Sequence, residues 1–280
     1  LWTYNNDKPN NGIRSIITIK NRGCNGATIL SDKAEEKISK FYNTVGWETE
    51  GNITEDARQW EDLREFSQEY ISKCRLRLLK YIPESGGNIL DMASGPIQYP
   101  EYLEYSKNFN KRYCVDLSDA ALESAKLKIG EHGVFLHGSF FDISLDEDFF
   151  DCSISLHTIY HMGKDRQEEA VRKLLYVTKV GKPVIILYSN PNAFFPRLIR
   201  RIRVLFGKSV QEEDNSLYFY QHPNEWWFRF CDIADVEVLP WRSLSAKLQQ
   251  ALIPNNKLGK LMLRVLFSLE TRFPHFFSKH

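Results

Sequence analysis

The sequence predicts an α/β protein built as a three-layer sandwich, with a mostly parallel central sheet, helices on both of its faces, and helical lid insertions. Two observations indicate this fold class. Short apolar runs that end in an acid or in small residues alternate with stretches of helical periodicity. Turn-forming residues follow these runs, and strands that alternate with helices are typical of βαβ units in a parallel sheet.

The run at residues 88–96 is the first predicted strand. Ile89, Leu90 and Met92 suit a strand that is covered on both faces, and the small residues at positions 94–96 form a turn after it. A ligand can approach such a backbone closely, and ligands of open α/β sheets bind at the carboxyl ends of the strands. The loop is therefore a candidate cofactor site, although an ordinary strand-to-helix connection has the same composition.

The second predicted strand, residues 112–118, ends in Asp116, and Ser118 caps the helical run behind it. The two strands and the segment between them have the spacing of a βαβ unit. In nucleoside-binding sheets an acid at the end of the second strand hydrogen-bonds the ribose. The alternative interpretation of Asp116 is an acid that stabilises the N-terminus of the following helix.

The remaining elements are predicted from the same patterns. Further strands are expected at residues 134–142, 150–156, 183–188 and 236–241. Helices are expected at residues 32–45, 55–81, 99–109, 165–177 and 258–273. Residues 14–20 have the composition of a short strand, but their neighbours offer no obvious partner.

Four segments, in this order, resemble the class I S-adenosylmethionine-dependent methyltransferases: LDMASGP, CVDLSDAALESA, HGSFFDI followed by FFDCSISLHTIYHM, and VTKVGKPVIILYSNP. They are most similar to the small-molecule branch that includes the ubiquinone and menaquinone biosynthesis C-methyltransferases, and the resemblance covers about residues 82–192. It implies a Rossmann-like fold, the cofactor S-adenosyl-L-methionine, and an enzyme that methylates a small-molecule or lipid-like metabolite at an O, N or C atom. The family's final antiparallel strand is not found before His280.

The first segment departs from the family's usual D-x-G-x-G-x-G. Ala93 and Ile97 stand where glycines are common, and we expect Ala93 to need only a conformation that an ordinary residue tolerates. Pro96 removes one amide donor from the loop. Cofactor affinity therefore follows less directly from the sequence than the topology does.

The resemblance assigns roles around the methionine and ribose of the cofactor. Asp91 is expected to order the loop and to meet the methionine amino group, and Asp116 to accept hydrogen bonds from both ribose hydroxyls. Ser94 and Gly95 are the best-placed residues of the loop itself. The N-terminal amides of the helix expected at residues 99–109 would face the methionine carboxylate.

The adenine end of the site departs further from the family. Ser139 stands where the family often has an acid that binds the adenine amino group. Either Asp142 substitutes for that acid, or Phe140 and Phe141 sandwich the ring. The complete set of expected cofactor-binding residues is Asp91, Ala93, Ser94, Gly95, Asp116, Leu117, Ser139, Phe140, Phe141, Asp142 and Leu156.

His157 and His161 are the expected catalytic residues, because they leave the fourth strand about where the transferable methyl group should lie. A methyl acceptor with a hydroxyl or amine must lose a proton, and imidazole accepts one near neutral pH. No acid-rich cluster accompanies this histidine pair, so no metal site is predicted. Two structural alternatives stay open: a buried histidine at position 157, and a side chain bonded to backbone at position 161.

We expect a loosely held polar tail at residues 1–30 and a single methyltransferase domain at residues 31–280, with a cofactor-binding core at about residues 56–192. Residues 31–55 and 193–280 would form the lid and the acceptor site. Tyr42 and Trp47 are lid candidates or simple anchors of a terminal helix, and the aromatic residues at 218–227 line the acceptor pocket or belong to the core. The basic amphipathic run at residues 194–208 is either a lid helix or a peripheral contact with an anionic membrane.

Composition limits the function classes. With 280 residues, 42% hydrophobic and 26% charged, the chain can bury one sizeable core, and its net charge of +1 argues against a general nucleic-acid binder. Five widely spaced cysteines without a C-x-x-C motif suggest a reduced, cytoplasmic setting rather than a disulfide framework or a zinc site. The oligomeric state stays open.

Two rival functions share the predicted fold. A nicotinamide-dependent oxidoreductase has the same acid-ended second strand, but the expected G-x-G-x-x-G is missing. A catalytically idle cofactor-binding or interaction module shares everything except turnover, and the altered glycine loop is compatible with it.

Overall fold

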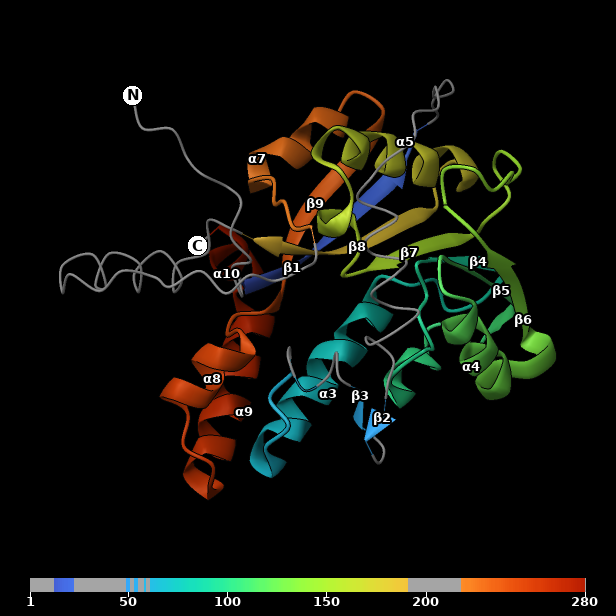
Figure 1. Ribbon diagram of the computed structural model, residues 1–280. Coiled ribbons are helices and arrows are strands. Elements are labelled where there is room, and N and C mark those ends of the chain that lie inside the picture. The colour runs from blue at the N-terminus through green and yellow to red at the C-terminus, as the bar shows by residue number, and fades with distance from the viewer. Residues whose placement is uncertain are drawn as a thin grey trace.

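The structure, a computed structural model, describes residues 13–22, 49–50, 53–54, 58, 61–190 and 218–279 (Figure 1). Its seven-stranded sheet has the order β6-β5-β4-β7-β8-β1-β9. The strands are β1 (Ile13–Asn21), β4 (Gly86–Met92), β5 (Phe109–Asp116), β6 (Gly133–His137), β7 (Cys152–Leu156), β8 (Pro183–Asn190) and β9 (Ala234–Arg242). Strands β4 to β8 pair in parallel, and β1 is antiparallel to both of its neighbours. The predicted fold class, a mostly parallel sheet in an α/β sandwich, is confirmed.

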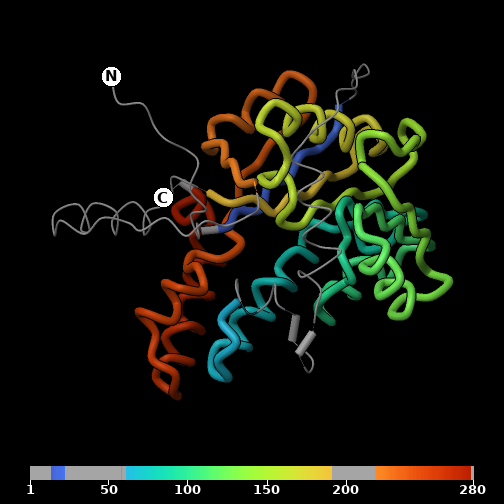
Figure 2. Tube along the Cα trace, viewed as in Figure 1, coloured from blue at the N-terminus to red at the C-terminus, as the bar shows by residue number. Residues whose placement is uncertain are grey.

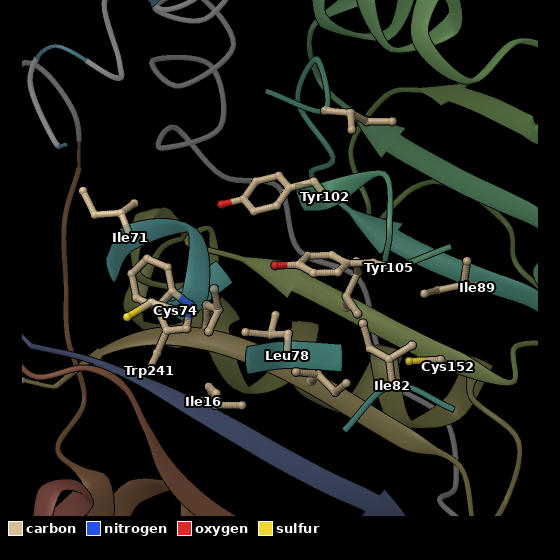
Figure 3. Packing of buried hydrophobic residues seen from close by; sticks show 14 of the residues in the cluster. Ile16, Ile71, Cys74, Leu78, Ile82, Ile89, Tyr102, Tyr105, Cys152 and Trp241 are labelled. Carbon is tan, nitrogen blue, oxygen red and sulfur yellow. The ribbon is translucent and has the colours of Figure 1, made fainter. Parts of the chain in front are cut away.

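Each face of the sheet carries its own apolar core, because neighbouring residues of a strand point to opposite faces. In β4, Ile89 belongs to one core and Leu90 to the other. Helices α3 (Gln68–Leu76) and α4 (Asp119–Ile129) cover the first core, and α5 (Gln167–Val177) and α7 (Asn224–Trp227) cover the second (Figure 1). Figure 3 shows part of the first core, with Tyr102 and Tyr105 among its buried residues.

Strand β1 corrects the expectation of a loose tail at residues 1–30. It lies inside the sheet, between β8 and β9, and Ile16, Ile17 and Ile19 are fully buried. Ile16 packs into one core while Ile17 and Ile19 pack into the other, so the strand is covered on both faces. The sequence shows no candidate before His280 for the family's final antiparallel strand, and β1 takes the place of that strand in the sheet. The blue trace in Figure 2 follows β1.

The helix expected at residues 55–81 is much shorter. Within the described chain, α3 is preceded by a 3-10 turn, η2 (Glu65–Ser67), and followed by another, η3 (Arg77–Lys80). Asp62 is completely buried and accepts hydrogen bonds from Arg64 and Ser67, 2.8 Å each, and from Gln249. The bonds from Arg64 and Ser67 are local and compete with helix formation, as bonds to Asp side chains commonly do.

Two further expected elements are shorter than predicted. The helix at residues 99–109 is only a 3-10 turn, η4 (Pro100–Tyr102), because β5 already begins at Phe109. A single turn of this length cannot offer a methionine carboxylate the amides of a helix N-terminus, so that expectation is wrong. The third strand ends at His137, since Gly138 has φ 140° and Ser139 opens a turn in which its carbonyl accepts from the N–H of Asp142.

The C-terminal part is helical after β9. Its helices are α8 (Ala246–Leu252), α9 (Lys257–Arg272) and α10 (Pro274–Lys279), and α9 matches the prediction for residues 258–273 closely. A two-stranded ribbon, β2 (Thr49–Glu50) with β3 (Ile53–Thr54), stands apart from the main sheet. No helix in the described residues is both long enough and apolar enough to span a bilayer. The predictions for residues 32–48, with Tyr42 and Trp47, and for 194–208 concern residues outside the described ranges.

Candidate active site

The parallel strands end together at one edge of the sheet, and most of the predicted site residues lie there. The strand register pairs Asp116 with His137 and Asp91 with Cys114, so the loops after β4, β5 and β6 are neighbours. Because β1 runs the opposite way, its first residues reach the same edge, where Arg14 pairs with Arg242. Segments from both ends of the described chain therefore meet at the candidate site.

The loop after β4 has the backbone of a glycine loop, although an alanine and an isoleucine stand at two of its three glycine positions. Ala93 has φ 56°, Gly95 φ 55° and Ile97 φ 49°, all in the left-handed region. The expectation that Ala93 adopts an ordinary conformation is therefore wrong. Left-handed backbone costs a residue with a Cβ about 1–2 kcal/mol, so the surrounding structure must hold the loop in this shape.

Asp116 holds that loop in place. Its Oδ2 accepts from the N–H of Gly95 at 2.8 Å, and its Oδ1 accepts from the N–H of Ser118 at 2.9 Å. Ser118 is the N-cap of α4, so Asp116 also supports the start of that helix, as the alternative interpretation proposed. Burial raises the pKa of Asp116 to about 6, although the two N–H groups favour the charged form. Each carboxylate oxygen keeps a second lone pair for a ligand.

Asp91 is fully buried and engaged within the sheet. Its Oδ2 accepts two bonds from the guanidinium of Arg112 on β5, one of them from Nε at 3.1 Å. The same guanidinium donates to the carbonyl of Tyr102 at 2.6 Å. The second oxygen of Asp91, Oδ1, is buried without a hydrogen-bond partner. Since an unpaired buried carboxylate oxygen is costly, this atom is a place where a donor from a ligand would be favoured.

The residues expected at the adenine end are split between a turn and the core. The hydroxyl of Ser139 accepts from the N–H of Phe141 at 3.2 Å, and Asp142 is exposed. Phe140 and Phe141 are buried, tilted by 58° with centroids 6.3 Å apart. Lys173 lies 5.1 Å from the ring of Phe140 and Arg166 lies 3.6 Å from that of Phe141. This geometry favours packing over a sandwich of two rings around an adenine.

His157 directly follows β7 in a strained conformation, with φ 62°. Its Nε2 lies 3.2 Å from Nη1 of Arg14, and because a guanidinium only donates, Nε2 must accept and Nδ1 must carry the proton. The ring packs edge-on against Trp241. Burial lowers the pKa of His157 well below its usual range, and the charge of Arg14 lowers it further. A neutral imidazole whose lone pair is occupied is a poor proton acceptor.

His161 lies in a 3-10 turn, η6 (Ile159–His161), and is hydrogen-bonded through its other ring nitrogen, Nδ1. Its Nδ1 lies 2.9 Å from the carbonyl of Tyr218, which can only accept, so Nδ1 carries the proton and Nε2 keeps its lone pair. Burial lowers the pKa of His161 to about 4, against the opposing effect of that hydrogen bond. The predicted backbone bond of this side chain is present, and it also fixes the tautomer that a base would need.

A buried charged cluster beside His157 was not predicted. Arg242 donates to Glu61 at 2.8 Å, Arg75 lies 3.6 Å from Glu61, and the guanidinium of Arg75 stacks 3.3 Å from the ring centre of Tyr99. Arg14 also lowers the pKa of Glu61, although burial opposes that shift. These residues come from β1, from the segment before α3, from α3 itself, from the loop after β4 and from β9. Nothing local in the sequence marks them, because each pairs with a distant segment.

Residues 90–186 match the family model described as a methyltransferase domain. The matched stretch makes up about a third of the chain. It runs from within β4 to within β8 and contains all the predicted site residues, and the cofactor that it indicates is S-adenosylmethionine. No curated protein matches the chain as a relative.

Solved structures with a similar course of the chain include the following three. The DhpI-SAM-HEP complex has 15% identity and a TM-score of 0.49 over 73% of this chain and 90% of its own. Magnesium protoporphyrin IX methyltransferase from Synechocystis PCC 6803, with bound SAH, has 15% identity and a TM-score of 0.48 over 68% and 84%. Phosphoethanolamine N-methyltransferase 1 of Haemonchus contortus has 10% identity and a TM-score of 0.49 over 69% and 39%. The assignment of the domain depends on the family model and on the sheet topology.

Proposed function

We propose that this methyltransferase acts on a small-molecule or lipid-like metabolite. The observation that carries the proposal is the carboxylate of Asp116, which ties the strained β4 loop to the start of α4 and keeps free lone pairs at the carboxyl edge. The resemblance to the ubiquinone and menaquinone branch supports a lipid-like acceptor. The acceptor atom, O, N or C, is left open.

The buried polar atoms at the edge fit the cofactor. The unpartnered Oδ1 of Asp91 suits the ammonium of the methionine moiety, and Asp116 suits the two ribose hydroxyls. Ala93, Ser94 and Gly95 would form the loop around the methionine. The other residues proposed to line the site are Leu117, Ser139, Asp142 and Leu156, with Phe140 and Phe141 as packing behind it. When bound, S-adenosylmethionine supplies a methyl group activated by its sulfonium.

We assign the two histidines different roles. His161 presents a lone pair at Nε2 and would accept the proton that a hydroxyl or amine acceptor loses. His157, whose Nε2 is occupied by Arg14, would form a fixed part of the wall of the site rather than act as the base. With a pKa of about 4, His161 stays neutral over the working pH range. Because holding the acceptor in line with the methyl group can lower the barrier by about 7–11 kcal/mol, a weak base at this position is sufficient.

The setting proposed for the enzyme is the cytoplasm. The described cysteines are Cys74, Cys114, Cys152 and Cys231, and all four are free thiols. Free thiols persist where glutathione and thioredoxin keep cysteines reduced.

Calorimetry on the whole chain tests the cofactor assignment. We expect S-adenosylhomocysteine to bind and NAD not to bind, and Asp116→Ala to weaken the binding of S-adenosylhomocysteine by about 1.5–3 kcal/mol. Glu123→Ala, on the exposed side of α4, is the matched control. NAD binding would support the oxidoreductase instead.

A second experiment tests turnover. Incubation with labelled S-adenosylmethionine and fractionated metabolites, polar and lipid, should label one class of acceptor. Binding of the cofactor without label in any fraction would support the idle module, so the two experiments separate all three functions.

A further inference from the structure

Helix α9 carries an apolar stripe that is exposed in the described part of the chain. Its members are Leu258 (60% exposed), Leu261 (56%), Met262 (40%), Val265 (51%) and Leu269 (43%). They recur at spacings of three and four residues, so they lie on one side of the helix. Phe273 and Phe276 continue the exposed apolar surface into α10. We call the five residues of α9 the α9 stripe.

The opposite side of α9 already forms the contact with the body of the protein. Leu263 and Phe267 belong to the first core, and Glu270 is 1% exposed. Glu270 accepts from Arg77 at 2.9 Å and from Tyr70 at 2.8 Å, which fixes the rotation of the helix about its axis. The α9 stripe is therefore a second apolar face, and it points away from the core. Figure 1 and Figure 2 show α8 and α9 at the outer margin of the molecule.

The charge around the stripe is mainly positive. The residues from Ala246 to Lys279 include the six cations Lys247, Lys257, Lys260, Arg264, Arg272 and Lys279. Glu270 is their only acid, and it is buried against Arg77. Lys257 and Arg272 stand at the two ends of α9 and are exposed. Glu69 of α3 pairs with Lys260 at 3.3 Å and with Arg264 at 2.7 Å, which leaves the surface with a net positive charge. An exposed apolar stripe on a surface of net positive charge matches the surface of an anionic bilayer.

We propose that α9 and α10 dock this protein on an anionic lipid membrane, with the α9 stripe entering the interface between head groups and acyl chains. The helix lies flat on the surface, since its 16 residues do not form a spanning segment. Repulsion between like charges argues against a second copy of the chain as the partner that covers the α9 stripe. A two-fold contact through this stripe would bring two surfaces of net positive charge together, and Glu69, the acid beside the stripe, already pairs with Lys260 and Arg264 of its own chain.

Vesicle co-sedimentation of the whole chain tests the proposal. The probes are vesicles of phosphatidylcholine alone and of phosphatidylcholine mixed with phosphatidylglycerol. The wild type should sediment with the anionic vesicles and much less with the neutral ones, and binding should fall between about 0.1 M and about 0.5 M salt. The triple variant Leu258→Ser, Leu261→Ser, Val265→Ser should lose at least about tenfold in binding, since binding scales with buried apolar area.

Matched variants keep the test independent of folding. Leu127→Ser removes a leucine that is 90% exposed on α4 and should leave binding unchanged. Lys257→Gln with Arg272→Gln should weaken binding to anionic vesicles, whereas Lys80→Gln with Lys126→Gln, two exposed lysines elsewhere, should not. Circular dichroism of every variant shows whether the fold is retained.

Three outcomes would overturn the proposal. One is the absence of binding to anionic vesicles at low salt. Another is full binding by a folded triple-Ser variant, which would assign the contact to a different segment such as residues 194–208. The third is a dimer in sedimentation velocity that the triple variant abolishes without any vesicle binding, which would make a second copy the occupant.

Discussion

Three residues at the carboxyl edge of the sheet hold backbone conformations that their side chains disfavour. Ala93 and Ile97 in the loop after β4, and His157 after β7, all have φ between 49° and 62°. Backbone strain of this kind persists only where surrounding contacts enforce it, and it concentrates at functional sites. At Ala93 the enforcing contact is adjacent, because the N–H of Gly95 is bound by Asp116.

Ala93→Gly tests whether the loop is strained. Glycine removes a cost of about 1–2 kcal/mol for left-handed backbone and loses about 0.4–1 kcal/mol through the greater freedom of the unfolded chain. We therefore expect a net gain of about 0.5–1 kcal/mol in the free energy of unfolding, measured by urea denaturation. Ala120→Gly in α4 is the control and should destabilise the protein. Destabilisation by both changes would contradict the strain.

The raised pKa of Asp116 makes cofactor binding depend on pH. The ribose hydroxyls need the ionised carboxylate, so affinity for S-adenosylhomocysteine should fall as the pH drops through about 6. The free energy of unfolding of the ligand-free protein should instead rise as the pH drops through about 6. Because the folded pKa lies above the ordinary value of 3.8, this group's favourable contribution is present below about pH 4 and is lost as the pH rises through about 6.

Calorimetry and thermal unfolding at several pH values measure the two trends. In Asp116→Asn both should flatten between pH 4 and about 6, since the titrating group is gone. A pH profile of binding that is the same in the variant and the wild type would assign the titration to another group.

The two histidines differ in their hydrogen bonds, which predict different effects on turnover. If the acceptor is a hydroxyl or an amine, His161→Ala should lower turnover by about 10²–10⁴ with little change in affinity for S-adenosylhomocysteine. His157→Asn keeps an acceptor for Arg14 and tolerates the left-handed backbone, so most of the turnover should remain. Single-turnover rates with the identified acceptor measure both. The reverse order of effects would restore His157 as the base.

At the scale of elements, β1 lies near the start of the described chain and α9 near its end, and contacts with distant segments fix each of them in the fold. Strand β1 pairs with β8 over residues 13–20 and with β9 over residues 14–21, so both of its edges are hydrogen-bonded. It also carries Arg14 into the site, which makes the first described strand part of the candidate chemistry. Helix α9 is joined to the body through Glu270, whose carboxylate binds Arg77, Tyr70 and the N–H of Ser243.

Ile17→Ala tests the place of β1 in the sheet. The side chain is fully buried in the second core, so its truncation should lower the free energy of unfolding by about 2–5 kcal/mol in a urea titration. The same change at Leu127, which is 90% exposed, should have an effect below about 0.5 kcal/mol. Equal, small effects at both positions would contradict the place of β1 in the sheet and support the loose tail that the local sequence suggests.

At the scale of the whole molecule, the sheet order brings the functional residues together from four separated regions. The neighbours of β1 lie more than 150 residues away in the sequence, and the pair of Arg242 with Glu61 spans 181 residues. Strands β4 to β8, in contrast, follow one another along the chain with a helix or turns between them. The stretch that matches the methyltransferase family model, residues 90–186, corresponds to this locally connected part of the sheet, and β1, α3 and β9 complete the sheet and its cores.

The sequence by itself determined the strands β4, β5, β7 and β8 and the acid at the end of β5, because each is a local pattern: an apolar run, a turn and a cap. It also determined the helices α5 and α9 through their periodicity. It did not determine the shortened α3, since the partners of Asp62 include Gln249, 187 residues away.

Only the tertiary structure decided what each polar residue of the site does. Asp91 is engaged by Arg112, His157 has its lone pair taken by Arg14, and His161 keeps its own free through Tyr218. The tertiary structure also made residues 13–21 a central strand. A strand covered on both faces is stabilised by the strands beside it and the cores above and below it, and none of these partners lies within its own stretch of sequence.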